Sequence, residues 1–199
     1  MTLEARPAGR KNSKLEFIAK SGDQNLYIEV KSPYRKRPPQ LRSGNDSDLI
    51  ESSLRQANEQ FDKGQCNVLV LVPSLRTTVY SRRKQLITAF YGEEKFVFDI
   101  DVEKGCATGP VETKFFPEGR FLKQWKNETA PRYKRVSAVI TIEEKLREEK
   151  HDVWFDHNIL VLYNPHAEVP CGEINWGNAP QFRQDGNHMK WTDGKRLLS

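Results

Sequence analysis

Residues 15–33 read LEFIAKSGDQNLYIEVKSP, two runs of alternating apolar and polar residues around a gap rich in Gly, Asp and Asn. This pattern is typical of a β-hairpin with a short polar loop. Because side chains alternate across a strand, Tyr27, Glu29 and Lys31 share one face of the second strand and its apolar residues share the other. The stretch therefore predicts a hairpin that buries its apolar face. Its other face carries a carboxylate and an ammonium about 7 Å apart, from a rise of ~3.3 Å per residue.

Glu16 is predicted on the first strand of this hairpin, where it can meet the face of Glu29. Two converging carboxylates bind a hard cation such as Mg²⁺ through oxygen. Such a metal polarises a phosphodiester and lowers the pKa of its bound water, and an adjacent lysine stabilises the pentacovalent phosphate. Glu16, Glu29 and Lys31 are therefore candidate catalytic residues, with both glutamates as metal ligands. Asp23 is an alternative first acid, although its place beside Gly22 favours a turn residue.

The sequence after the hairpin predicts a helix and then a buried strand. The helix starts at Ser47 or Asp48 and stops at Gly64, and its apolar stripe is Leu49, Ile50, Leu54, Ala57 and Phe61. The continuous apolar run at 67–73 predicts a strand buried on both faces. Further predictions are a helix over 83–91, strands over 95–102, 136–142 and 154–163, an extended piece at 103–117, a helical turn within 120–128, a charged surface excursion at 143–152 and a mostly irregular tail from 164. The predicted class is α/β with a mixed sheet.

Length and composition predict one domain without a membrane span. The chain has 199 residues, of which 37% are hydrophobic and 30% charged, and no apolar run approaches the ~20 residues that cross a bilayer. We assign residues 1–13 to a basic flexible arm and residues 14–199 to a single α/β domain, with its core motif at 14–75, elaborations at 76–163 and the tail at 164–199. Because residues 1–14 are polar and basic, we expect no standard signal peptide and a cytoplasmic location.

Charge and cysteine usage add two expectations. The net charge of +5 and the pI near 9.1 are compatible with a polyanionic partner. A basic loop, Arg35, Lys36 and Arg37, follows the second hairpin strand and could contact phosphates, with a solvated linker as the alternative. The three cysteines, at 66, 106 and 171, are odd in number and widely separated, which favours reduced thiols over a disulfide framework.

Glu29-Val30-Lys31, with Glu16 before it and a helix and core strand after it, resembles the PD-(D/E)XK superfamily of restriction-endonuclease-like nucleases. That superfamily places an acid on one strand and (D/E)-X-K on the next, and many members add a polar helix residue that faces the site. The resemblance covers roughly residues 14–75. It implies Gln56 as the helix residue, since Gln56 lies nearer the helix start than the alternative Gln60.

The same resemblance implies a restriction-endonuclease-like core, a mixed β-sheet flanked by helices, with extra C-terminal strands. It also implies a hydrolase, an endonuclease or exonuclease that needs Mg²⁺ or Mn²⁺ and acts on nucleic acid, DNA in the first instance. A strand with Glu-X-Lys on its exposed face is most often a solvated face with a cross-strand ion pair. We therefore keep two alternatives, a catalytically inactive module of this fold that binds nucleic acid or a protein, and an α/β domain with ordinary basic loops. A homodimer is left open.

Overall fold

The computed structural model describes residues 2–5, 17–32, 47–72, 83–116, 119–125, 128–149, 152–172, 174–185 and 188–192. Within these residues one large sheet contains β1 (Thr2–Ala5), β2 (Phe17–Ser21), β3 (Gln24–Lys31), β4 (Cys66–Leu71), β9 (Ala138–Glu149), β10 (Asp152–Tyr163), β11 (Gln181–Asp185) and β12 (His188–Thr192). Its strand order is β1-β2-β3-β4-β9-β10-β11-β12. The pairs β3–β4, β4–β9 and β10–β11 are parallel and the other neighbours are antiparallel. The predicted α/β class with a mixed sheet is confirmed.

The predicted hairpin forms from β2 and β3, whose register pairs Phe17 with Ile28 and Ser21 with Gln24. Gly22 and Asp23 make the two-residue turn, and Gly22 has a φ of 58°, which a glycine adopts without strain. Asp23 is therefore a turn residue, and the alternative that made it the first acid is wrong. It lies six positions from Glu29, about 20 Å along the strand at ~3.3 Å per residue.

Two helices cover one side of the sheet, which we call the first face. In α1 (Ser47–Gln60) the predicted stripe is buried at Ile50, Leu54 and Ala57, and Phe61 follows directly. The second helix, α2 (Arg83–Tyr91), matches its predicted bounds. Both helices share one core with sheet residues, and this first-face core includes Leu69, Leu71, Leu86, Phe90, Tyr91, Val139, Leu160 and Leu162. The prediction of helices flanking the sheet is thus corrected, since both described helices pack on the same face.

The opposite, second face carries a separate core. Its sheet residues include Leu26, Ile28, Val68, Ala138, Ile140 and Val161, and Cys171, Ile174 and Ala179 from the described residues between Asn164 and Pro180 pack over them. Trp176 donates a hydrogen bond from Nε1 to the Tyr163 hydroxyl at 2.8 Å, and this bond anchors the covering segment. An irregular segment therefore covers the sheet on the second face, whereas helices cover it on the first face.

A disulfide joins Cys66, the first residue of β4, to Cys171 in the covering segment. The Cα atoms lie 5.7 Å apart although 105 positions separate the residues in the sequence. The predicted reduced state is therefore wrong for these two cysteines, and Cys106 is free and exposed. Sequence spacing carries no signal for this bond because the fold alone brings the two ends together.

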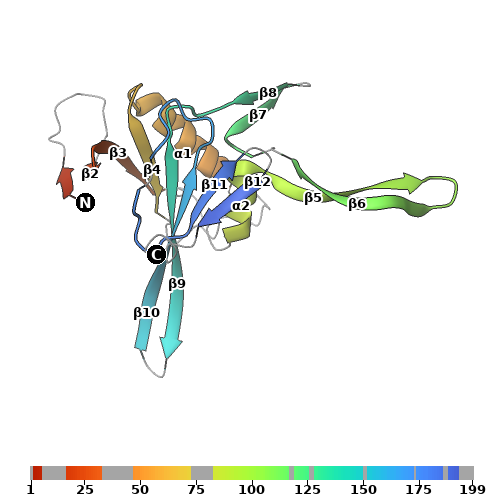
Figure 1. Ribbon diagram of the computed structural model, residues 1–199. Helices are drawn as coiled ribbons and strands as arrows, with labels where there is room; N and C mark the ends of the chain where they lie inside the picture. The colour runs from red at the N-terminus through yellow and green to blue at the C-terminus, as the bar shows by residue number, and fades with distance from the viewer. Residues whose placement is uncertain are drawn as a thin grey trace.

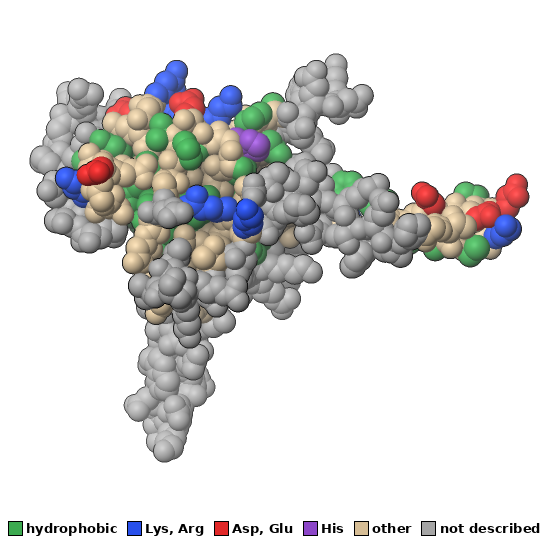
Figure 2. All heavy atoms as spheres, viewed as in Figure 1, with side chains coloured by type: hydrophobic (Ala, Val, Ile, Leu, Met, Phe, Trp, Pro, Cys, Tyr) green, Lys and Arg blue, Asp and Glu red, His purple; other side chains and the backbone are tan. Residues whose placement is uncertain are grey.

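Two long hairpins project from the body of the molecule (Figure 1). One pairs β5 (Glu93–Asp101) with β6 (Cys106–Phe116), and the other is the outer part of β9 and β10. The ladder of the second hairpin runs to the pair Glu149 and Asp152, so the described residues of the predicted surface excursion at 143–152 belong to β9 and β10. A projecting ribbon has solvent on both faces, so its sequence needs no apolar alternation. Figure 2 shows the first hairpin reaching away from the other described side chains.

Three further segments differ from the predictions. Thr2–Ala5, assigned to the basic arm, forms the edge strand β1 against β2. The expected helical turn within 120–128 is instead the small pair β7 (Leu122–Trp125) and β8 (Glu128–Pro131). The tail contains the β11–β12 hairpin, which extends the large sheet. Each of these short strands depends on a partner strand, a contact that a local pattern does not contain.

The helices of the described chain, fourteen and nine residues long, fall short of what a bilayer span requires.

Candidate functional site

Glu29 and Lys31 lie two positions apart on β3 and point to the first face, as the alternation predicts. Glu29 is paired in register with Leu69, whose side chain belongs to the first-face core. The Glu29 side chain is only 3% exposed and that of Lys31 is 15% exposed. The Lys31 ammonium lies 2.8 Å from Glu29 Oε1. The polar face of this strand is therefore covered, which the sequence did not predict, and its charges are paired with each other.

Lys31 also contacts the flank of α1. Its Nζ donates to Gln60 Oε1 at 3.0 Å and to Gln56 Oε1 at 3.3 Å. The i, i+4 spacing of the two glutamines places them on one flank of the helix. Gln56 in turn donates from Nε2 to Ser52 Oγ at 3.4 Å. The structure thus brings the predicted Gln56 to the site, and the shorter, partly buried contact is that of Gln60.

The second oxygen of the Glu29 carboxylate distinguishes this site from a simple ion pair. Oε2 is buried and has no hydrogen-bond partner in the part of the chain that the structure describes. An unsatisfied buried carboxylate oxygen costs free energy, on the order of 1–3 kcal/mol or more for a charged group. Such a cost is recovered when a cation or a hydrogen-bond donor meets the oxygen. Glu29 therefore has one oxygen held by Lys31 and one available for a ligand.

The remaining predicted site residues are Glu16 and the basic loop Arg35, Lys36 and Arg37, all of which lie outside the described residues. Glu16 directly precedes Phe17, and Phe17 pairs with Ile28, the residue before Glu29. Across the described ranges no three His, Cys, Asp or Glu side chains gather as a metal-binding group. Of the two predicted metal ligands, Glu16 and Glu29, only Glu29 lies among the described residues.

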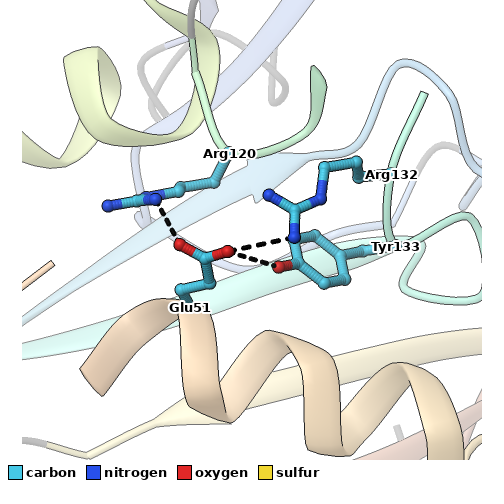
Figure 3. Close-up of polar contacts among 4 residues, drawn as sticks. All are labelled: Glu51, Arg120, Arg132 and Tyr133. Atoms are coloured by element: carbon cyan, nitrogen blue, oxygen red, sulfur yellow. Dashed lines mark hydrogen bonds and ion pairs between the residues drawn. The ribbon is translucent and has the colours of Figure 1, made fainter. Parts of the chain in front are cut away.

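A second charged cluster, shown in Figure 3, lies on the other flank of α1. The Glu51 carboxylate accepts from Arg120 Nη1 at one oxygen, and from Arg132 Nη2 at 3.0 Å and the Tyr133 hydroxyl at 3.4 Å at the other. The Arg132 guanidinium also lies over the Tyr133 ring, 4.7 Å from its centre. No local sequence pattern indicates this cluster, since Arg120 and Arg132 follow Glu51 by 69 and 81 positions.

Burial raises the pKa of Glu51, but the Arg132 hydrogen bond and the charges of Arg120 and Arg132 outweigh this effect. The net result is a pKa below the ordinary value of 4.5. Because folding favours the charged form, its contribution to stability is complete above the ordinary pKa and is lost as the pH falls through the lowered one. The contacts of Glu51 with Arg120, Arg132 and Tyr133 therefore stabilise the position of α1 more strongly at neutral pH than in acid.

We expect Glu51→Gln to lower the free energy of unfolding by about 1 kcal/mol at about pH 7, because the partly exposed ion pairs are lost. In acid, below the lowered pKa, the difference from the native chain should shrink, because Glu51 is then protonated in both states. Urea unfolding followed by circular dichroism at several pH values measures this. Glu59→Gln, at an exposed position of the same helix, is the control and should leave the free energy of unfolding at about pH 7 close to that of the native chain. A difference that stays constant down to about pH 3 would contradict the role given to Glu51.

Comparison of the chain with protein-family models, with curated proteins and with solved structures gave no match. Functional inference for this chain therefore depends on its own residues.

Proposed function

We propose that this chain is a metal-dependent nuclease that hydrolyses phosphodiester bonds of nucleic acid, DNA in the first instance. The observation that carries the proposal is Glu29, a buried carboxylate with one oxygen paired to Lys31 and the other without a partner among the described residues. A hard cation such as Mg²⁺ or Mn²⁺ suits that free oxygen, because both ions prefer carboxylate ligands. Glu16 is the proposed second ligand.

The residues around Glu29 have separate roles in this proposal. Lys31 places a positive charge beside the metal ligand, where it stabilises the negative charge that develops on the phosphate. Gln60 and Gln56 accept hydrogen bonds from the Lys31 ammonium and so fix its position. Both glutamines are positioning residues, since they act through Lys31. The cation, when bound, supplies Lewis-acid activation of the phosphodiester and an activated water.

The order of elements around the site also supports the proposal. A hairpin with the Glu-X-Lys strand second, then α1, then the parallel strand β4 is the order expected for a restriction-endonuclease-like core. Strand β1 adds a further strand before the hairpin. We propose this core for residues 14–75, with the strands after β4 as additions. Arg35, Lys36 and Arg37 begin four positions after Lys31 in the sequence and are the proposed phosphate contact.

The proposal is tested by the cation dependence of DNA cleavage. Purified protein should cut duplex or single-stranded DNA with Mg²⁺ or Mn²⁺ and not with a chelator. Glu29→Gln, which keeps the shape of the side chain but removes its charge, should lose cutting and weaken Mn²⁺ binding in calorimetry. Glu59→Gln is the matched control at an exposed glutamate and should retain both. Equal cutting by Glu29→Gln would overturn the assignment.

The second candidate is an inactive module of the same fold that binds nucleic acid or a protein. It is favoured by the contact between Lys31 and Glu29 at 2.8 Å, which neutralises the carboxylate without any cation. In that case calorimetry would detect no Mg²⁺ or Mn²⁺ binding, while DNA would still be retained at low salt. If the protein instead binds no oligonucleotide at low ionic strength, the basic loops are ordinary solvent-exposed surface.

The cytoplasmic location stays a prediction, and the Cys66–Cys171 disulfide weighs against it, because disulfides persist mainly in oxidising compartments.

A further inference from the structure

Large hydrophobic side chains are exposed at two separate surfaces of the described chain. They are Phe17 at 36%, Phe98 at 46%, Ile100 at 58%, Val102 at 89% and Ile159 at 43% exposure. Three of the five follow one another at alternate positions near the end of the β5–β6 hairpin, and the other two lie on the large sheet. Such clustering is informative because single exposed apolar residues are ordinary but grouped ones mark contact surfaces.

The first surface, which we call the arm tip, is formed by the exposed apolar residues Phe98, Ile100, Val102 and Ala107 near the end of the hairpin. Phe98, Ile100 and Val102 alternate along the chain, and Ala107 lies opposite Ile100 on the paired strand. An isolated two-stranded hairpin is marginally stable in water, so an uncovered apolar side favours a partner. The tip stands far from the body of its own chain, as Figures 1 and 2 show. It therefore cannot cover an apolar surface of the same copy.

The second surface, which we call the apolar strip, crosses the second face of the sheet. Its members are Phe17 on β2, Val30 on β3, Val70 on β4, Ile142 on β9 and Ile159 on β10. The register pairs Val30 with Val70 and Ile142 with Ile159. These residues are exposed or half-buried, whereas the neighbouring second-face core is covered by the chain from 164 to 180. The strip is thus a partly exposed continuation of that core.

Charge indicates which surfaces can meet. The hairpin from Glu93 to Phe116 contains six acidic and three basic residues, a net charge of −3. Because the whole chain has a net charge of +5, the residues outside the hairpin carry +8. Two arm tips would repel each other, and a polyanion would repel the arm as well. The arm is instead complementary to the body of another copy of this chain.

We propose that two copies exchange arms, with the arm tip of each lying on the apolar strip of the other. The apolar tip residues meet the strip, and the net negative charge of the arm is attracted by the net positive charge of the body. In a reciprocal exchange each copy gives its tip to the other copy and receives one in return, so the pair is closed and contains two identical contacts. All five exposed large hydrophobic side chains are covered in this arrangement.

The test is the mass in solution, measured by light scattering on a sizing column. The native chain should run at twice its mass of 23.1 kDa. Ile100→Asp on the tip, and Ile159→Asp or Phe17→Asp on the strip, should each run at 23.1 kDa with an unchanged circular dichroism spectrum. Thr108→Asp adds the same charge on the opposite side of the hairpin, where Thr108 pairs with Asp99, and should remain a dimer.

Mixing distinguishes arm exchange from other dimers. Ile100→Asp keeps an intact strip and Ile159→Asp keeps an intact tip, so their equimolar mixture should recover a heterodimer through one intact contact. A monomeric native chain would overturn the proposal. A dimer that survives Ile159→Asp and Phe17→Asp would overturn the strip as the docking surface, and failure of the mixture to recover a dimer would overturn the reciprocal arrangement.

Discussion

Lys31→Met should reduce metal-dependent DNA cutting by about 10²–10³-fold, the usual effect of removing one group that stabilises developing charge. The same change should lower stability. It leaves Glu29, a 3% exposed carboxylate, without its cationic partner, and breaking a buried pair from one side costs about 3–5 kcal/mol. Methionine keeps the length of the lysine stem, so the expected loss comes from charge rather than from a cavity. Cleavage assays and urea unfolding measure the two effects on the same protein.

A double variant separates the structural from the chemical role of Lys31. Glu29→Gln combined with Lys31→Met removes both charges, so it should recover most of the lost stability while remaining unable to cut. Lys20→Met, at an exposed position of the adjacent strand β2, is the matched control and should match the native chain in both assays. Full cutting by Lys31→Met, or a double variant no more stable than the single one, would refute the role assigned to this lysine.

Gly119→Ala should destabilise the fold by about 3 kcal/mol, the upper part of the range for forced overpacking. A Cβ at this position would overlap the Phe90 carbonyl and the Tyr91 nitrogen, which are backbone atoms and cannot move aside by changing rotamer. The close approach exists because the chain after Gly119 satisfies the end of α2. Arg120 N donates to Ala89 O at 2.8 Å and Phe121 N donates to Phe90 O at 3.1 Å. These carbonyls would otherwise lack partners at the helix end.

Thermal unfolding should reveal this effect as a fall in Tm of about 6–12 °C, at roughly 2–4 °C per kcal/mol for a chain of this size. Packing should be lost too, because Phe121 lies against both aromatic rings of the helix end, 5.2 Å from Phe90 and 5.4 Å from Tyr91 between ring centres. The control is Gly172→Ala, where an added Cβ would meet Gln24 Oε1 at an ordinary 3.4 Å. Equal Tm values for the two alanine variants would contradict the close packing of Gly119 against the end of α2.

The central elements were predictable because their signals are local. The alternation in residues 15–33 is a period of two, and it gives the hairpin and the shared face of Glu29 and Lys31. The stripe at Ile50, Leu54 and Ala57 is a period near 3.6, and it gives the helix and its buried side. Each period relates residues that are only a few positions apart, so the pattern of a strand or a helix can be recognised within a short stretch of sequence.

The site could be predicted only in part, for a physical reason. The spacing of Glu29 and Lys31 on one strand is local, and it placed both on one face. That this face is buried beneath α1 follows from the crossover between β3 and β4, and so does the contact of Lys31 with Gln60. The distance of Gln56 from the helix start is a position along the chain alone, whereas the hydrogen bonds of Lys31 depend on how the helix lies across the sheet.

By itself, then, the sequence determined the hairpin, both helices, the buried strand β4 and the placement of a carboxylate and an ammonium on one face. The tertiary structure alone decided that both helices share the first face, that Cys66 meets Cys171 and that Arg120 and Arg132 converge on Glu51. It also decided that Glu29 is buried with one oxygen free of partners in the described chain. The reason is that periodicity follows from covalent neighbours, while contacts across 69 to 105 positions follow from the packing of the whole sheet.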